Sequence, residues 1–347
     1  MGMILSSVAV TAGLSAALVL LLGPVARRIG LVDSPGGRKH HRYPVPLTGG
    51  VAILLAVLVG MLLAPVDVAT IVPLVVGMVM LAVFGVVDDY LNINAFIKAV
   101  VQILVATLVV LWSAVEVTTL GNLLGFGGIG LGWFSTAFTV LAMVLLINAV
   151  NMLDGLDGLA GGVVFVMFAW LAGVVAMVSG VAGAMLLVLM LAALAGFLVL
   201  NMRSPWRKRA RVFMGDSGSM MLGLALGWFA VRFGQGAEAV MVPAVVAWIL
   251  AVPVFDMLTV MLIRLRQGRS PLSADRNHIH YLLIDAGYSQ TAVVWLLIAI
   301  AALGGAIGIA GWQLGLSEPV LFYPWLALFF TYLVFVWRSR ASHDARA

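Results

Sequence analysis

The feature that most constrains this chain is a series of long apolar segments that recurs from one end to the other. A helix that crosses the hydrocarbon core of a bilayer needs about 20 mostly apolar residues. We therefore predict an all-α polytopic membrane protein with about eleven transmembrane helices. The predicted helices lie near residues 4–26, 47–64, 71–88, 96–113, 134–151, 161–179, 182–201, 217–233, 239–263, 291–314 and 320–337.

Composition supports the same class. Of the 347 residues, 63% are hydrophobic and 10% are charged, whereas a soluble domain has about 45–50% and about 25%. The connections between the apolar segments are mostly short, so we predict a single integral membrane domain over residues 1–347. Cysteine is absent, which excludes disulfides and thiolate metal sites.

Basic residues predict the orientation. Seventeen of the nineteen Lys and Arg residues fall in three connections and the tail, which an eleven-helix arrangement places on one side. The positive-inside rule makes that side cytoplasmic, so the N-terminus is expected outside and the C-terminus inside. This pattern explains the net charge of +5 without a nucleic-acid partner. Ten of the eleven Asp residues lie at or near the same face, which we therefore take as the functional face.

The third apolar segment ends in the pair Asp88-Asp89. Carboxylates at a helix C-terminus are disfavoured by roughly 0.3–1 kcal/mol each. A merely solvated helix end is the alternative, but Lys or Arg would suit it better. The pair therefore indicates a site that handles a metal-bound phosphate or a proton.

The fifth segment ends in a dense polar run, in which Asn148, Asn151, Asp154 and Asp157 recur at every third position. This spacing can place them along one side of a helix end or turn. The glycines after each Asp permit close approach of a ligand. An Asx-rich turn between two helices is the alternative.

Two further segments carry candidate ligands. Residues 214–219 (MGDSGS) open the eighth segment, where Asp216 is either an ordinary N-cap or part of a phosphate site at a helix N-terminus. The long inner loop contains Arg276, His278 and His280, which suit phosphate better than a helical metal site because i and i+2 point apart. An interfacial amphipathic turn is the alternative for this loop.

Asp256 lies deep in the ninth segment, and an acid there is usually paired or functional. Lys98 and Gln102, one turn apart on the fourth segment, are candidate partners for it or its neighbours. The converging carboxylates at the inner face need counter-charge. A hard cation such as Mg²⁺ supplies it, since Mg²⁺ typically bridges one or two carboxylates and substrate phosphates. These residues predict a membrane enzyme that acts on a phosphorylated substrate.

The motifs DDYLNI, NAVNMLDGLDGLAGG, VFMGDSGS and SPLSADRNHIHYLL, with RKHHRYPVPLTGG before them, resemble the signatures of the polyprenyl-phosphate N-acetylhexosamine-1-phosphate transferases. The resemblance spans about residues 32–287 in the family's order. It is nearest to the WecA-type branch, which moves GlcNAc-1-phosphate from UDP-GlcNAc to undecaprenyl phosphate. The MraY-type branch, which uses UDP-MurNAc-pentapeptide, has three consecutive His at the last motif. Tyr281 also departs from the WecA-type His-Ile-His-His, so another UDP-N-acetylhexosamine is the alternative donor.

The resemblance implies roles for the matching residues. Asp216 and Asp154 would hold Mg²⁺, which Mn²⁺ could replace, while Asp88 and Asp89 would handle the lipid phosphate, one as general base. The substrate-binding residues would be Lys98, Asn148, Asn151, Asp157, Arg276, His278 and His280.

The expected products are undecaprenyl-diphosphate-GlcNAc and UMP, made at the bacterial inner membrane in the first membrane step of a cell-envelope polysaccharide such as lipopolysaccharide O-antigen. Direct attack by the lipid phosphate is expected, although the residues also allow a covalent aspartyl intermediate, and a homodimer is compatible with the sequence. A secondary transporter is the rival class, but its ion sites lie near the bilayer midplane at repeat interfaces. This chain shows no internal repeat.

Overall fold

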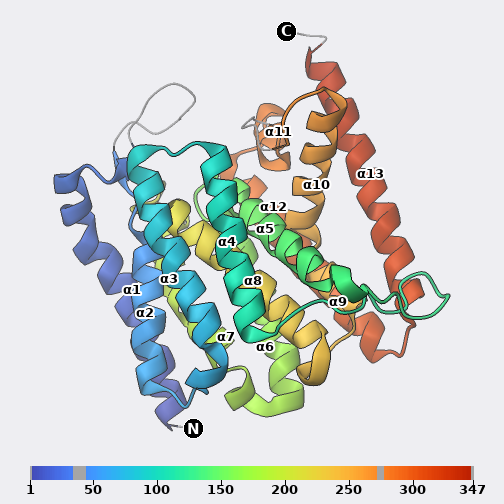
Figure 1. Ribbon diagram of the computed structural model, residues 1–347. Coiled ribbons are helices and arrows are strands. Elements are labelled where there is room, and N and C mark those ends of the chain that lie inside the picture. The colour runs from blue at the N-terminus through green and yellow to red at the C-terminus, as the bar shows by residue number, and fades with distance from the viewer. Residues whose placement is uncertain (1, 34–43, 272–276, 345–347) are drawn as a thin grey trace.

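The computed structural model describes residues 2–33, 44–271 and 277–344, which form a bundle of α-helices (Figure 1). A two-stranded antiparallel sheet, β1 (Val32–Asp33) and β2 (Val45–Pro46), is the only sheet in this part of the chain. The helices are α1 (Gly2–Ile29), α2 (Gly49–Leu63), α3 (Val68–Leu91), α4 (Ala95–Ser113), α5 (Ser135–Leu153), α6 (Leu159–Gly183), α7 (Met185–Asn201), α8 (Gly215–Gly234), α9 (Pro243–Ile249), α10 (Ala251–Arg266), α11 (Ile279–Asp285), α12 (Gln290–Gln313) and α13 (Glu318–Asp344).

All eleven predicted apolar segments are helical, but one prediction of a continuous helix is wrong. The segment predicted near 239–263 starts at Pro243 and consists of two helices, α9 and α10, that meet at 79°. Pro253 explains the break, because its nitrogen cannot donate to the carbonyl of Ile249 and its ring clashes with that carbonyl. In the described part of the chain, seven helices are long and apolar enough to cross a membrane, and the bent pair makes an eighth candidate.

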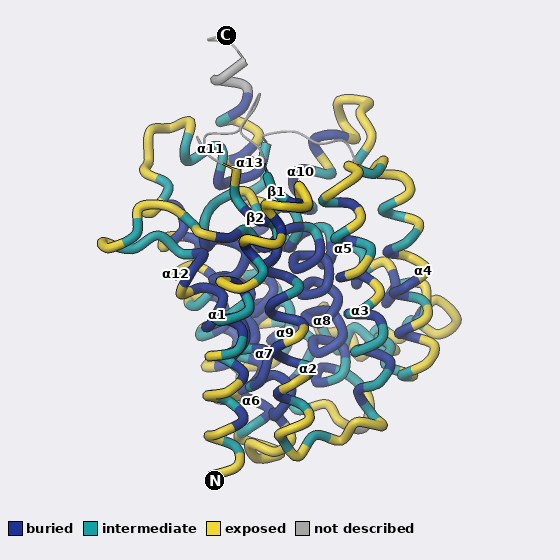
Figure 2. Tube along the Cα trace, turned by 90° about the vertical axis from the view of Figure 1, so that its left-hand side faces the viewer, coloured by how far each residue is buried: buried dark blue, intermediate teal, exposed yellow. Residues whose placement is uncertain are grey.

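Helix α8 forms the centre of the bundle. All of its residues except Asp216 and Arg232 are buried, and α2, α3, α5 and α6 pack around it (Figure 2). Glycine makes this packing close: a Cβ atom at Gly85 of α3 would collide with the backbone of Ser217. In a bilayer, where lipid is as apolar as Leu, such small residues let helices associate by backbone approach.

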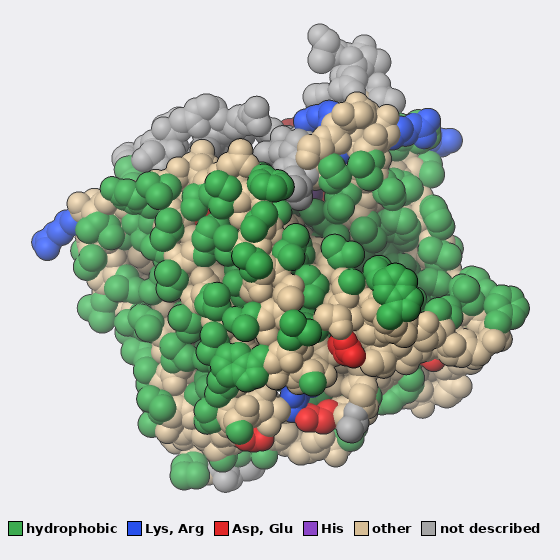
Figure 3. Space-filling view, in the orientation of Figure 1, with side chains coloured by type: hydrophobic (Ala, Val, Ile, Leu, Met, Phe, Trp, Pro, Cys, Tyr) green, Lys and Arg blue, Asp and Glu red, His purple; other side chains and the backbone are tan. Residues whose placement is uncertain are grey.

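The bundle has two distinct ends. Helix α1 begins at the lower end in Figure 1, whereas α13 finishes at the upper end. Hydrophobic side chains cover most of the face in Figure 3, with most of the visible Lys and Arg side chains toward its upper part and a further basic side chain beside acidic ones near its lower edge. The C-terminal end of α3, the end of α5 and the start of α8 meet at the upper end of the bundle, where they frame the candidate site.

Candidate active site

The start of α8 is held in place by the segments around it. The backbone N–H groups of Gly49 and Gly50 donate to the carbonyls of Phe213 and Met214, at 3.0 and 2.9 Å. Gly215 has a φ of +73° and approaches Asp89 so closely that a Cβ atom there would lie 2.5 Å from Asp89 Oδ2. Only glycine meets both conditions without strain. The sequence motif thus turns the chain so that Asp216 enters the first turn of α8.

Lys98 joins the carboxylates of two different helices. Its Nζ lies 2.5 Å from Asp88 Oδ2 and 3.1 Å from Asp216 Oδ2. Asp88 is buried, and its Oδ1 also accepts the backbone N–H of Ile93 at 2.8 Å. A buried carboxylate needs such a partner because the loss of hydration is costly. Lys98 therefore allows two acids to be close together in the site.

Asp89 differs from Asp88 in its contacts. Its Oδ1 accepts the backbone N–H of Asp216 at 3.0 Å, so it caps α8 from a neighbouring helix. Its Oδ2 is buried and has no hydrogen-bond partner among the described residues. The positive end of the α8 dipole stabilises a carboxylate at this position. Of the two acids, Asp89 therefore keeps an oxygen available for a further ligand.

The two predicted asparagines of α5 lie at different depths. Asn151 donates from Nδ2 to Asp216 Oδ1 at 2.7 Å and to Ser219 Oγ at 2.9 Å, so it orients the Asp216 carboxylate. Asn148, one turn earlier, donates to Gln102 Oε1 at 2.6 Å. Neither asparagine lines the pocket described next. In this arrangement both asparagines lie outside the pocket and hold other side chains, Asp216 and Gln102, in position.

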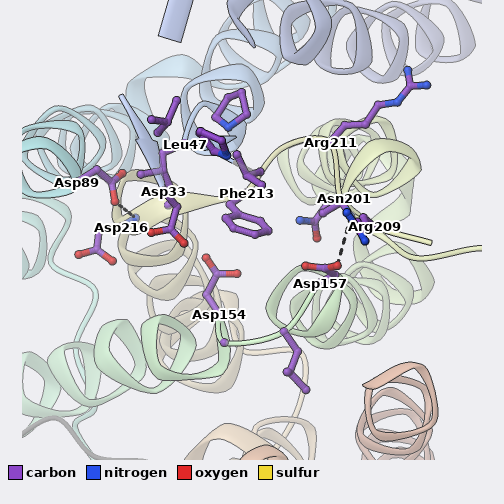
Figure 4. A pocket seen from close by; sticks show the side chains of 18 of the residues that line it. Asp33, Leu47, Asp89, Asp154, Asp157, Asn201, Arg209, Arg211, Phe213 and Asp216 are labelled. Atoms are coloured by element: carbon purple, nitrogen blue, oxygen red, sulfur yellow. Dashed lines mark hydrogen bonds between the residues drawn. The ribbon is translucent and has the colours of Figure 1, made fainter. Parts of the chain in front are cut away.

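A pocket of about 1780 Å³ opens beside these residues. In Figure 4, Asp89 and Asp216 lie on one side, Arg209 and Arg211 on the opposite side, and Asp154 between them. Part of its apolar wall comes from α1, through Val19, Leu20, Gly23 and Pro24. The pocket thus combines carboxylates, guanidinium groups and an apolar wall.

The turn after α5 supplies Asp154 and Asp157. Burial raises the pKa of the Asp154 carboxyl well above its ordinary value, and the charges of Asp216 and Asp89 raise it further. Asp157 Oδ2 accepts from Arg203 Nε at 2.7 Å and from the backbone N–H of Ala210 at 3.2 Å. Asp157 therefore fastens the basic loop between α7 and α8 to this turn.

The basic loop after α7 was not among the predicted site residues. The pocket is lined by four side chains of this loop, Arg203, Lys208, Arg209 and Arg211. In the sequence, the abundance of basic residues in this loop predicted only that the loop is cytoplasmic. Five basic residues within nine positions were the available signal. Guanidinium groups pair well with phosphate, so this loop can neutralise a phosphorylated ligand.

The histidine motif lies behind the pocket wall. His278 and His280 are buried, their rings stack with centroids 5.9 Å apart, and neither lines the pocket. A Cβ atom at Gly155 would lie 2.6 Å from His280 Nε2, so this ring is against the turn that carries Asp154. Tyr281 does line the pocket. Arg276 lies outside the described residues, as do the basic residues between positions 34 and 43.

The carboxylates around the pocket suit a hard cation that takes only some of its ligands from the protein and the rest from water or phosphate. Asp154, Asp216 and Asp89 offer carboxylate oxygens around one pocket, and Asp89 Oδ2 is buried without a partner among the described residues. Within that part of the chain, no three acidic or histidine side chains are close enough to enclose an ion. Mg²⁺ commonly binds through one or two carboxylates together with water and phosphate. The residues therefore fit Mg²⁺ bound with a phosphorylated substrate.

The fold and the site together define a polytopic helical membrane protein whose pocket can bind phosphate groups. The chain belongs to glycosyl transferase family 4, whose model matches residues 71–234. It is 33% identical to the undecaprenyl-phosphate alpha-N-acetylglucosaminyl 1-phosphate transferase of Pasteurella multocida, over 92% of this chain and 90% of the relative. It is also 33% identical to the Escherichia coli K12 protein of that name, over 89% and 84%, and 34% identical to that of Yersinia pestis, over 93% and 87%.

Proposed function

We propose that this protein transfers GlcNAc-1-phosphate from UDP-GlcNAc to undecaprenyl phosphate and releases UMP. The observation that carries the proposal is the pocket in which Asp89 and Asp216 face Arg209 and Arg211. The relatives named above carry the corresponding activity in their names. The similarity to these relatives covers 92% and 89% of this chain, so the same reaction is the simplest function for this site.

In the proposed reaction, an oxygen of the lipid phosphate attacks the sugar-linked phosphorus of the donor, and the bond to UMP breaks. The basic loop with Arg209 and Arg211 would hold the donor diphosphate, and Lys98 would balance the charges of Asp88 and Asp216. Asp89, which has an unpartnered oxygen, would accept a proton from the lipid phosphate when that phosphate is protonated.

Asp216 and Asp154 would hold Mg²⁺. When bound, it would offset negative charge on the transferring phosphoryl group. Asn151 would then keep the Asp216 carboxylate in orientation, because its Nδ2 donates to Asp216 Oδ1 at 2.7 Å. The close approach of Gly215 to Asp89 keeps both acids at the same wall of the pocket.

The apolar wall from α1 supports a polyprenyl acceptor. Leu20 lines the pocket and is 52% exposed, and its neighbour Leu21 is 67% exposed, which supports a wall that continues to the lipid-facing surface. We propose that the polyprenyl chain leaves the pocket past α1. The proposal includes eleven membrane crossings, an external N-terminus and a site that faces the cytoplasm of a bacterial inner membrane, because nucleotide sugars are cytoplasmic substrates. A reporter after Arg340 and another near Gly127 test that topology and should report opposite sides.

The nucleotide that leaves tests the reaction. Purified protein is incubated with undecaprenyl phosphate, Mg²⁺ and UDP-GlcNAc, and the nucleotides are separated by chromatography. Cleavage within the diphosphate gives UMP in step with the lipid product, and excess UMP reverses it. Transfer of the sugar alone would give UDP, which would contradict the proposal. A panel of other UDP-N-acetylhexosamines, with mass analysis of the lipid, identifies the preferred sugar.

A further inference from the structure

Asp256, which the site described so far does not use, is the centre of a buried hydrogen-bond network. Its Oδ2 lies 2.6 Å from His278 Nδ1, and its Oδ1 accepts the backbone N–H of Ile279 at 2.9 Å and the hydroxyl of Tyr332 at 2.7 Å. Asp256 and His278 are 3% and 1% exposed. Two donors already converge on this carboxylate, so it is best satisfied when Nδ1 of His278 is a third.

The network connects three parts of the chain that are distant in sequence. Asp256 belongs to α10, His278 precedes α11, and Tyr332 lies on α13 near the C-terminus. A second contact fastens the same segments, because Arg340 of α13 donates from a terminal guanidinium nitrogen to the carbonyl of Asn277 at 2.8 Å. The histidine segment is therefore held from outside the pocket by the last helix of the bundle.

The other side of His278 faces the candidate active site. Its ring stacks on His280 at an interplanar angle of 14°, and His280 lies against Gly155 in the turn that carries Asp154. His278 Nε2 is buried and has no hydrogen-bond partner within the described ranges of the chain. One ring nitrogen is thus fixed by Asp256, and the stacked pair transmits that position to the pocket wall.

We propose that Asp256 and Tyr332 are positioning residues for the transfer reaction, which fix the orientation and tautomer of His278 and, through His280, the position of the turn at Gly155. The inference rests on the proposed function, since it assigns a role within that site. The chemistry is that of a carboxylate that holds an imidazole in one tautomer for a neighbouring reaction. Tyr332 does not line the pocket, and its hydroxyl donates to Asp256, so it would act through that carboxylate.

The direct test is solid-state ¹⁵N NMR of the full-length protein, labelled at histidine and reconstituted in lipid, with His278→Gln to assign the signal. We expect His278 in the wild-type protein to carry a proton on Nδ1. Asp256→Asn keeps the shape of the side chain but can present an N–H to the ring, so Nδ1 should lose its proton and Nε2 should gain it. A wild-type His278 with unprotonated Nδ1 would overturn the proposal, and this measurement does not depend on any variant of Asp256 or Tyr332 folding.

Activity provides the second test, with a matched control on the same helix. Tyr332→Phe removes only the hydroxyl and should lower kcat about 10-fold, and Asp256→Asn about 100-fold, as removal of a group that orients a ligand histidine does. Tyr323→Phe removes a hydroxyl that donates to the Leu124 carbonyl at 3.1 Å at the other end of α13 and should leave activity unchanged. Thermal unfolding checks that the variants are folded.

The outcomes separate this inference from the proposed function. If Tyr332→Phe is folded and as active as Tyr323→Phe, the positioning role is wrong whatever the reaction. If Tyr332→Phe is unfolded, the positioning role is tested instead by the activity of Asp256→Asn and by the ¹⁵N spectrum of the wild-type protein. If His278→Gln is fully active while the wild-type tautomer is as expected, the assignment of His278 to the reaction fails and the structural network stands. If UDP is the released nucleotide, the proposed function itself fails.

Discussion

The backbone N–H of Asp216 donates to the carboxylate of Asp89, 3.0 Å away on a different helix. This contact makes the first turn of α8 and the last turn of α3 a single unit. One acid caps the helix, while the other presents its side chain to Lys98 and Asn151. The two residues therefore have different roles, which substitution can separate.

Asp216→Asn should abolish transfer without unfolding the protein. Asn preserves the shape of the side chain and remains a good residue near a helix N-terminus, but it removes the charge that pairs with Lys98 and that would hold a cation. We expect a loss of about 100-fold or more in turnover, measured as lipid product formed. Ser219→Ala, which removes a neighbouring acceptor for Asn151, is the control and should retain most activity. Near-normal Mg²⁺-dependent turnover in Asp216→Asn would show that Asp216 only caps the helix and does not hold the cation.

The raised pKa of Asp154 predicts a pH dependence. Because the folded state holds this proton more tightly than an unfolded chain with the ordinary value of 3.8, the contribution of Asp154 to stability decreases as pH rises from that value through the raised pKa. A cation must displace the proton, so Mg²⁺ should bind more tightly as pH rises. Thermal unfolding over a range of pH, with EDTA or with Mg²⁺, checks both signs. Asp154→Asn should remove this part of the dependence, and an unchanged profile in that variant would refute the assignment.

Lys98→Ala should destabilise the protein. It leaves the buried carboxylate of Asp88 without its cation, and the charge of Asp216 lies close to it. Removal of one partner of a buried ion pair costs about 3–5 kcal/mol. Chemical or thermal unfolding in detergent measures the change. Arg28→Ala removes an exposed cation at the end of α1 and should have little effect on stability; equal effects of the two substitutions would show that the buried ion pair is unimportant.

Gly85→Ala tests the close packing between α3 and α8. The new methyl group would collide with the backbone of Ser217, next to Asp216, so the two helices must separate. We expect a loss of about 1–3 kcal/mol and lower activity, since overpacking shifts backbone as well as side chains. Gly13→Ala in α1 is the matched control, because nothing lies within 4 Å of a Cβ atom there. That variant should be neutral or slightly more stable, as a helical Gly-to-Ala change usually is.

The sequence predicted the elements well because apolar length is a local property. Each apolar segment is helical, and the polar residues at the ends of α3, α5 and α8 converge as their common face predicted. The break between α9 and α10 could have been predicted from Pro253, but not its angle, which packing determines. The hydrogen bond between Tyr332 and Asp256 could not have been predicted from the sequence, because 76 residues separate them and no motif contains both. The basic loop was not assigned to the site from the sequence, because the positive-inside rule already explained its Lys and Arg residues.

The enclosure of α8 has a consequence for how this protein responds to its membrane. Outer helices such as α1 and α13 are largely exposed and must adjust their tilt when bilayer thickness changes. Helix α8 is surrounded by other helices along its length, so hydrophobic mismatch reaches it only through its neighbours. The residue that would hold the cation therefore sits on the helix least exposed to variation in lipid composition. Turnover should then depend on acyl-chain length mainly through access of the acceptor past α1, and little through the geometry at Asp216.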